Sequence, residues 1–182
     1  MLRPSDLAVA LRIRFFPDER YQDTASALHI GTGSAHRSVQ RLLKAGVLFR
    51  ESRKTNLHRL YGMICWGAPQ IFFPSVGSDS IRGIATALDP EEDGPGQSSG
   101  FVWPSEKGDD IGTALKPLYP KCILLPTTDR VTYEALCLFD TLRVGSAGAR
   151  QRAQERLREI VIDGARTPRL PRLDDAVFDA FG

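Results

Sequence analysis

The clearest pattern of apolar and polar positions in the chain lies in residues 21–48. Within residues 34–45, apolar side chains recur at helical spacing, which predicts an amphipathic helix. One face carries Ala35, Val39, Leu42 and Leu43, and the other carries His36, Arg37, Gln40, Arg41 and Lys44. The second face thus holds only hydrogen-bond donors and positive charge. Such a helix can pack against its own domain and reach a polyanion at the same time.

The residues on either side of this helix predict where it begins and ends. Residues 21–30 form a shorter helical pattern. This pattern would bury Ala25, Leu28 and Ile30. Gly31 and Gly33 then interrupt the helix, because paired glycines allow the positive φ values of a tight turn. Ser34 is the predicted N-cap of the second helix, and Gly46 is its predicted stop.

A hairpin is predicted directly after the second helix. Residues 47–49 have the composition of a short strand, and residues 57–66, with their aromatic and bulky side chains, that of a returning strand. Residues 50–56 (RESRKTN) form a basic turn between them. The hairpin would therefore have a cationic tip.

Three further helices are predicted. The first begins at Pro4-Ser5, with Ser5 as its N-cap, and ends before Pro17. The other two cover residues 129–145 and 147–163, and the last of them is strongly amphipathic. Together these two helices form a hairpin, whose apolar face can either complete a dimer or pack on the rest of the chain.

The remaining segments have weaker patterns. Residues 67–126 hold only short apolar stretches and an acidic run rich in Pro, Gly and Ser at residues 89–100. That run has too little apolar content to order itself. The tail, residues 164–182, ends in an acidic and aromatic segment that can dock on the protein or on a partner. Its apolar side chains are Val177, Phe178 and Phe181.

Charge is distributed unevenly along the 182 residues, although the net charge is only +2. Residues 1–60 contain eleven basic and five acidic side chains, a net charge of +6, so the remainder carries −4. This asymmetry is typical of a protein in which one part meets nucleic acid. The chain has no apolar run of about 18 residues and no secretory leader pattern. We therefore expect a cytoplasmic protein with no membrane partner.

The sequence predicts neither a metal site nor a cofactor. The three cysteines, Cys65, Cys122 and Cys137, lack CxxC spacing, and buried free thiols are the expected state. The three histidines, His29, His36 and His58, lack the spacing of metal ligands.

Catalytic motifs are also missing from the sequence. Gly31-x-Gly33 opens a GxGxxG pattern, but position 36 is histidine and helices are expected on both sides, which excludes a dinucleotide-binding turn. There is no phosphate-binding P-loop and no GxSxG turn. We therefore do not expect an enzyme.

The helices at residues 21–45 and the hairpin after them resemble the winged helix-turn-helix of bacterial transcriptional regulators of the MarR and ArsR kind. The resemblance covers about the first third of the chain and is carried by the positions just described. It implies an α+β, mainly helical fold with four parts. These are a winged helix-turn-helix domain (1–66), an irregular connecting region (67–126), a helical hairpin for packing or dimerisation (127–163) and a tail (164–182).

The resemblance also implies a function. It indicates a regulator that acts as a repressor and binds double-stranded DNA as a homodimer. The second helix would lie in the major groove, and the hairpin would contact phosphates or the minor groove. The expected DNA-binding residues are Ser34, His36, Arg37, Ser38, Gln40, Arg41, Lys44, Arg50, Arg53, Lys54 and Arg59. Arginine can pair with guanine and glutamine with adenine, so Arg37, Gln40 and Arg41 are the first candidates.

A protein-interaction module is the alternative function. Short strings such as WGAPQIFFP and VWP, and the helix YEALCLFDTLRVG, resemble those of uncharacterised bacterial winged-helix proteins, some of which act as antitoxins. Such a protein would bind and neutralise a toxin-like partner, and it could bind its own promoter as well. A polar and basic second helix favours DNA, because a protein-binding helix more often exposes apolar side chains.

Overall fold

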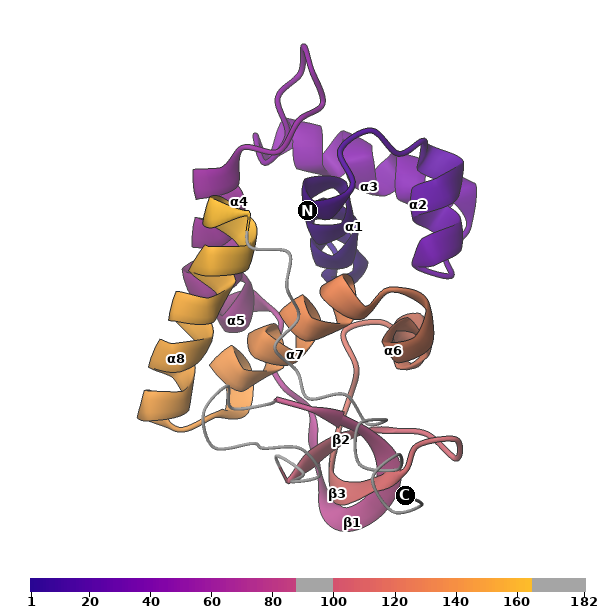
Figure 1. The fold of residues 1–182 in the computed structure, drawn as a ribbon, viewed down its shortest axis with the longest axis vertical. Coiled ribbons are helices and arrows are strands. Elements are labelled where there is room, and N and C mark those ends of the chain that lie inside the picture. The colour runs from indigo at the N-terminus through magenta and orange to yellow at the C-terminus, as the bar shows by residue number, and fades with distance from the viewer. Residues whose placement is uncertain (88–99, 165–182) are drawn as a thin grey trace, which may run out of the picture.

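The computed structural model describes residues 1–87 and 100–164, and it has an α+β, mainly helical fold (Figure 1). The first helices are α1 (Pro4–Phe15), α2 (Tyr21–Ala27), α3 (Thr32–Lys44), α4 (Leu57–Gly62) and α5 (Ala68–Ile71), with a π-helical turn (Met63–Gly67) joining the last two. The strands are β1 (Val76–Thr86), β2 (Phe101–Pro104) and β3 (Asp110–Leu115). A 3₁₀ turn (Pro120–Leu124), α6 (Leu125–Thr128), α7 (Arg130–Val144), α8 (Ala147–Arg158) and a π-helical end (Glu159–Asp163) complete the described chain.

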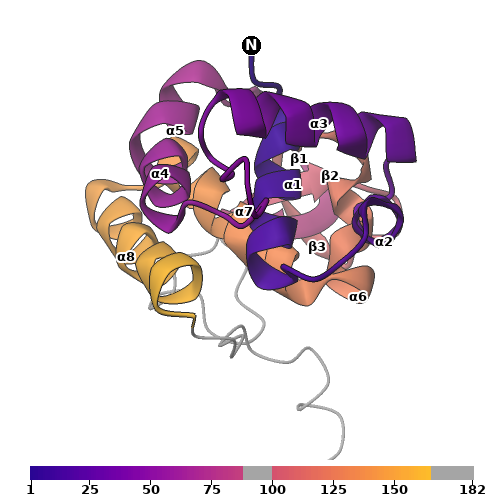
Figure 2. The ribbon, with the colours of Figure 1, turned by 90° about the horizontal axis from the view of Figure 1, so that it is seen from above.

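Helices α1, α2 and α3 pack together at one end of the molecule, where α3 lies across the top of the view (Figures 1 and 2). The spacing that predicted these helices also predicts their buried sides, since Leu7, Leu11, Val39 and Leu42 are almost fully buried. Helix α1 begins at Pro4, so its N-cap is Arg3 rather than the predicted Ser5. Proline suits this first helical position, because its missing N–H would have no partner there.

The segment predicted as a returning strand, residues 57–66, is helical instead. The side chain of Asn56 accepts a hydrogen bond from the backbone N–H of Arg59, so Asn56 caps a new helix at this point. Leu60, Ile64 and Ala68 are buried at spacings of four residues, the period of a helix and not of a strand. The aromatic residues of this stretch suggested a strand, but the cap and the period decide the outcome.

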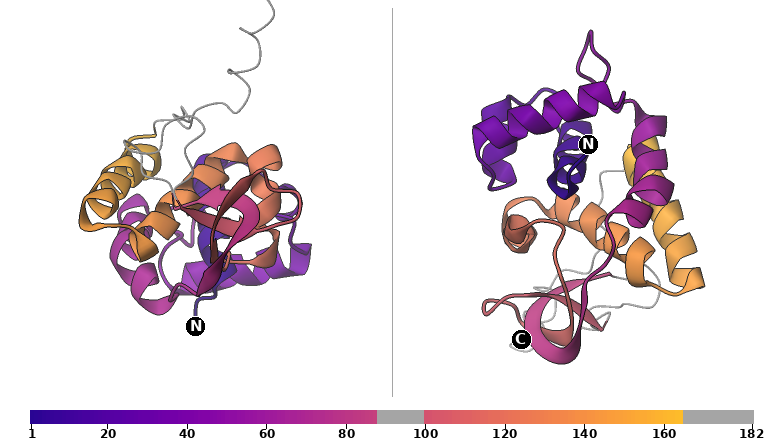
Figure 3. Two further views of the ribbon diagram at one scale, coloured as in Figure 1. Left: turned by 90° about the horizontal axis from the view of Figure 1, so that it is seen from below. Right: turned by 180° about the vertical axis from the view of Figure 1, so that it is seen from behind.

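The central region was expected to be irregular, and in fact it contains a small closed barrel (Figures 1 and 3). Strand β1 pairs antiparallel with both β2 and β3, and β2 pairs parallel with β3. Two glycines allow this tight closure, since a Cβ on Gly83 or Gly108 would collide with the backbone of the facing segment. Of the acidic run at 89–100, only Gly100 lies among the described residues, and the tail beyond Gly164 lies outside them.

The predicted helical hairpin is present as α7 and α8. Asp129 and Ser146 cap these helices, each through a side chain that accepts a backbone N–H. Helix α7 lies at the centre of the molecule and packs against α1, α5, α6, α8 and β1 (Figure 1). The sequence left open whether the apolar face of this hairpin packs on the rest of the chain or completes a dimer. Helix α7 uses its apolar surface within the chain. None of the helices in the described ranges is both long and apolar enough to cross a membrane.

A buried carboxylate joins α7 to the barrel. Asp140 accepts hydrogen bonds from Thr86 Oγ1 at 2.8 Å and Trp103 Nε1 at 2.7 Å. Its other oxygen accepts from Arg143 Nη2 at 2.5 Å. The side chains of Asp140 and Arg143 are only 1% and 3% exposed, so their charges compensate each other away from water.

Replacing Asp140 with Ala is expected to destabilise the protein by about 3–5 kcal/mol, because it leaves the Arg143 charge buried without its partner. The free energy of unfolding from urea titrations measures this loss. The matched control is Asp79→Ala on the exposed start of β1, which should change stability little. An Asp140→Ala protein as stable as the control variant would contradict the assigned role.

Candidate nucleic-acid interface

Helix α3 and the loop that follows it form one end of the molecule (Figure 1). The helix begins at Thr32, two residues before the predicted N-cap Ser34. The carbonyl of Gly31 accepts the N–H groups of both Ser34 and Ala35, which places Ser34 inside the first turn. The Ser34 hydroxyl instead accepts from Arg37 Nη2 at 3.1 Å and so holds that guanidinium along the helix surface.

Most of the residues expected to bind DNA are exposed on this end of the molecule. The exposed ones are His36, Arg37, Gln40, Lys44, Arg50, Arg53, Lys54 and Arg59. Ser34 is half-buried. Ser38 is 1% exposed, and Arg41 points toward α1, so these two do not belong to the exposed face.

Arg41, which was expected to contact DNA, forms a paired contact with Asp6 of α1 in this structure. Its Nε and Nη2 donate to the two oxygens of Asp6 at 2.7 and 2.6 Å, and Nη2 also donates to the Ser38 hydroxyl. Burial acts to raise the pKa of Asp6, but hydrogen bonds from Arg41 and from the backbone of Arg3 outweigh it, so the pKa is lowered. The pair therefore fixes the orientation of α3 on α1.

The loop after α3 is a short hairpin that projects beyond the helix (Figure 1). Phe49 N–H donates to the Lys54 carbonyl at 2.9 Å, and Asn56 N–H donates to the Val47 carbonyl at 2.8 Å. Arg53 has a φ of +56°, in the left-handed region, where the chain reverses. Arg50, Arg53 and Lys54 are exposed on this hairpin, and the one acid among residues 49–56 is Glu51.

Arg59 lies on α4, and not on a strand as predicted. Its Nη1 donates to the carbonyl of Ala45 at 3.5 Å, at the end of α3. Gly46, with a φ of +68°, ends α3 as predicted, and a Cβ there would collide with Arg59. Arg59 therefore covers the C-terminal end of α3 and keeps its charge beside the hairpin.

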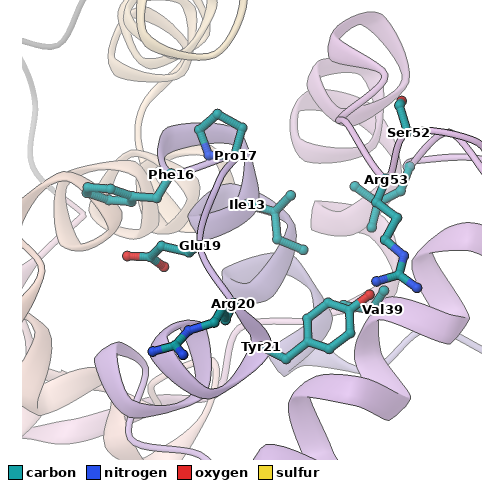
Figure 4. Close-up of a pocket in the computed structure, with 10 residues that line it drawn as sticks. Ile13, Phe16, Pro17, Glu19, Arg20, Tyr21, Val39, Ser52 and Arg53 are labelled. Atoms are coloured by element: carbon teal, nitrogen blue, oxygen red, sulfur yellow. The ribbon is translucent and has the colours of Figure 1, made fainter.

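Tyr21 is a further contact residue at this end of the molecule, and the sequence pattern did not indicate it. Its ring lies edge-on to His36, with ring centroids 5.9 Å apart, and the Arg53 guanidinium lies 5.3 Å from its centroid. Figure 4 shows Tyr21 and Arg53 side by side on the wall of a pocket of about 380 Å³, which Ile13 and Val39 also line. Tyr21 thus links α2 to both α3 and the hairpin. A lone tyrosine at a helix start gives no sequence signal for this role.

Within residues 1–87 and 100–164, no three His, Cys, Asp or Glu side chains are grouped closely enough to hold a metal ion. The cysteines at 65, 122 and 137 are buried free thiols. Burial raises the pKa of Cys65 to about 11, which keeps this thiol protonated and unreactive near neutral pH. The exposed basic face is therefore the candidate site that the described residues support best.

Asp6→Asn is expected to destabilise the protein by about 1–3 kcal/mol near neutral pH, because Arg41 loses a charged partner. The folded-state pKa of Asp6 lies below the ordinary value of 3.8, so its contribution is present above that value. The contribution is lost as the pH falls through the folded-state pKa. The difference in the free energy of unfolding between wild type and variant should therefore shrink below pH 3.8. A difference that stays constant with pH would contradict the role assigned to the Asp6 carboxylate.

Tyr21→Ala is expected to loosen the hairpin, because Arg53 loses the ring on which it packs. A cation–π contact at an exposed site contributes about 0.5–1 kcal/mol, so amide hydrogen exchange at residues 49–54 should become about two- to fivefold faster. Tyr21→Phe is the matched control, since it keeps the ring. Equal exchange rates in wild type and Tyr21→Ala would show that the ring does not hold the hairpin.

No protein-family model, curated protein or solved structure matches this chain. Its function must therefore be argued from the geometry and charge of its own surface.

Proposed function

We propose that this chain is a sequence-specific DNA-binding regulator, acting as a repressor, in which α2, α3 and the hairpin at residues 45–56 work as a winged helix-turn-helix. The observation that carries the proposal is a surface rich in exposed basic side chains at one end of the molecule, on which Glu51 is the one acid among residues 49–56. None of its six basic side chains forms an ion pair with a described carboxylate. They are Arg37, Lys44, Arg50, Arg53, Lys54 and Arg59. Uncompensated charges held in one place attract the phosphate backbone.

Each element of this surface has a role in the proposed complex. Helix α3 enters the major groove, where Arg37 can donate two hydrogen bonds to guanine and Gln40 can pair with adenine. Ser34 holds the Arg37 guanidinium along the helix before binding, which reduces the entropy lost on contact. Arg53 and Lys54 on the projecting hairpin contact phosphates or the adjacent minor groove.

The exposed side of α3 favours DNA over a protein partner. Its exposed side chains are polar or charged, whereas Ala35, Val39 and Leu42 face the protein core. A protein-binding helix would need apolar anchors at the exposed positions. Arg41, which the sequence placed among the readers of bases, serves the proposed function by positioning α3 on α1.

The test is a fluorescence-anisotropy titration of the protein against duplex DNA from its own upstream region and against scrambled duplex, at two salt concentrations. Binding should be tighter for the native sequence and should weaken steeply with salt. Arg37→Ala should lower the affinity for the native sequence by about 1–3 kcal/mol. The matched control is Arg150→Ala, which removes an exposed arginine from α8, away from the proposed surface, and should leave binding nearly unchanged.

Two results would contradict parts of this proposal. Weak binding that is equal for both duplexes would mean that the surface does not read sequence, and a protein partner would then be the better function. An equal loss of affinity for both duplexes in Arg37→Ala would assign Arg37 to a phosphate and remove it from base recognition.

A further inference from the structure

One short segment of the chain differs from the cationic end, because it exposes large apolar side chains. They are Trp66, Ile71, Phe73 and Val76, which are 59%, 62%, 78% and 49% exposed. We call these four side chains the apolar strip. They lie within eleven consecutive residues, between the π-helical turn and the start of β1. Half of the large exposed apolar side chains in the described residues are thus gathered in one segment.

The strip is large enough to form the centre of a protein interface. From its exposed fractions and the usual size of such side chains, it presents on the order of 400 Å² of apolar surface. A stable interface buries about 800 Å² on each partner, with an apolar centre and a polar rim. Gln70, Ser75 and Ser78 are exposed beside the strip and can supply that rim.

Charge favours a second copy of the chain as the partner. Residues 60–78 contain no Asp, Glu, Lys or Arg. In a dimer with two-fold symmetry the same patch faces itself, so any charge in the patch would lie close to an identical charge. The nineteen residues contribute no such charge, and Lys116, whose backbone N–H donates to the Ser75 carbonyl at 2.9 Å, lies at the edge of the strip.

The position of the strip also suits a two-fold dimer. The helices α4 and α5 run along the length of the molecule, from the end that holds α3 toward the barrel (Figures 1 and 3). A two-fold axis parallel to this length, beside the strip, keeps both copies of α3 at the same end. The two helices could then reach successive major grooves on one side of a duplex.

We infer that the apolar strip is the interface of a homodimer formed by two copies of this chain. The sequence left open whether the helical hairpin packs within the chain or forms a dimer; α7 packs within its own chain, and the strip offers another surface for dimerisation. The use of the dimer on DNA rests on the function proposed above, but the dimer itself does not. Placing the two cationic ends side by side lets both copies bind one DNA molecule.

Sedimentation velocity of the full chain over a wide range of concentration tests this inference. Wild type should sediment as a dimer that dissociates on dilution. Ile71→Lys and Phe73→Lys should each raise the dissociation constant of the dimer about tenfold or more, because they place like charges against each other in an apolar interface. The matched control is Ile111→Lys on β3, because Ile111 is 61% exposed and Ile71 is 62% exposed. This variant should dimerise like wild type.

Thermal unfolding of each variant shows whether it is folded, so a variant that only fails to fold is recognised. A wild type that remains a monomer at every concentration would overturn the inference, and the chain's own tail or another protein would then cover the strip. A dimer unaffected by both strip variants would overturn the inference as well.

DNA titrations of the same proteins separate the two proposals. Sequence-specific binding by a monomer contradicts only the dimer, whereas a dimer that binds both duplexes equally contradicts only the DNA function.

Discussion

The rest of the structure depends on the burial of α7. This helix contacts α1, α5, α6, α8 and β1, so it joins the two ends of the molecule. Because its surroundings are apolar, a charge on it must be compensated inside the protein. Asp140 meets this condition with hydrogen bonds from Thr86, Trp103 and Arg143, which attach the barrel to α7 at a defined place. The Tyr133 hydroxyl, which donates to the Ala85 carbonyl at 2.6 Å, adds a second polar contact between α7 and the barrel.

The need to compensate charges inside the protein also explains how the cationic end is built. Buried carboxylates hold the arginines that organise the core, as Asp6 holds Arg41 and Glu134 holds Arg156. These two acids are thus paired away from the exposed face of the cationic end, whereas the exposed basic side chains of α3 and the hairpin form no ion pair with a described carboxylate. Aligning α3 on α1 through a paired contact at 2.6–2.7 Å gives this helix one orientation. A surface that reads DNA bases requires such a fixed orientation.

Part of this fold could be predicted from the sequence, and the reasons differ by segment. The helices α3, α7 and α8 have a helical repeat of apolar residues or a clear polar face, and these local signals were sufficient. Residues 57–66 also have a helical repeat, but their bulky composition favoured a strand and hid it. The barrel gave little signal, because the first half of β1 is exposed on both faces and shows no alternation of apolar and polar positions.

The candidate site also shows which features local sequence patterns cannot predict. Sequence spacing identified the exposed face of α3, since spacing determines which side chains share a face. It placed Arg41 on that face, because a long side chain at its edge can turn either way. Only the position of Asp6, 35 residues earlier, decides that Arg41 turns inward. Tyr21 was missed for a related reason, because its partners His36 and Arg53 come from segments distant in sequence.

The two unusual surfaces lie on one continuous stretch of helix. Arg59, on α4, is the last cation of the basic end, and the uncharged segment begins at the next residue. Helix α4, the π-helical turn and α5 follow one another without a break from Leu57 to Ile71. A helix is a rigid element. In the proposed dimer, contact between the two strips therefore also sets the distance between the α3 helices of the two copies. In the proposed dimer, the spacing of the two half-sites on DNA is therefore set by the length and direction of this helical stretch.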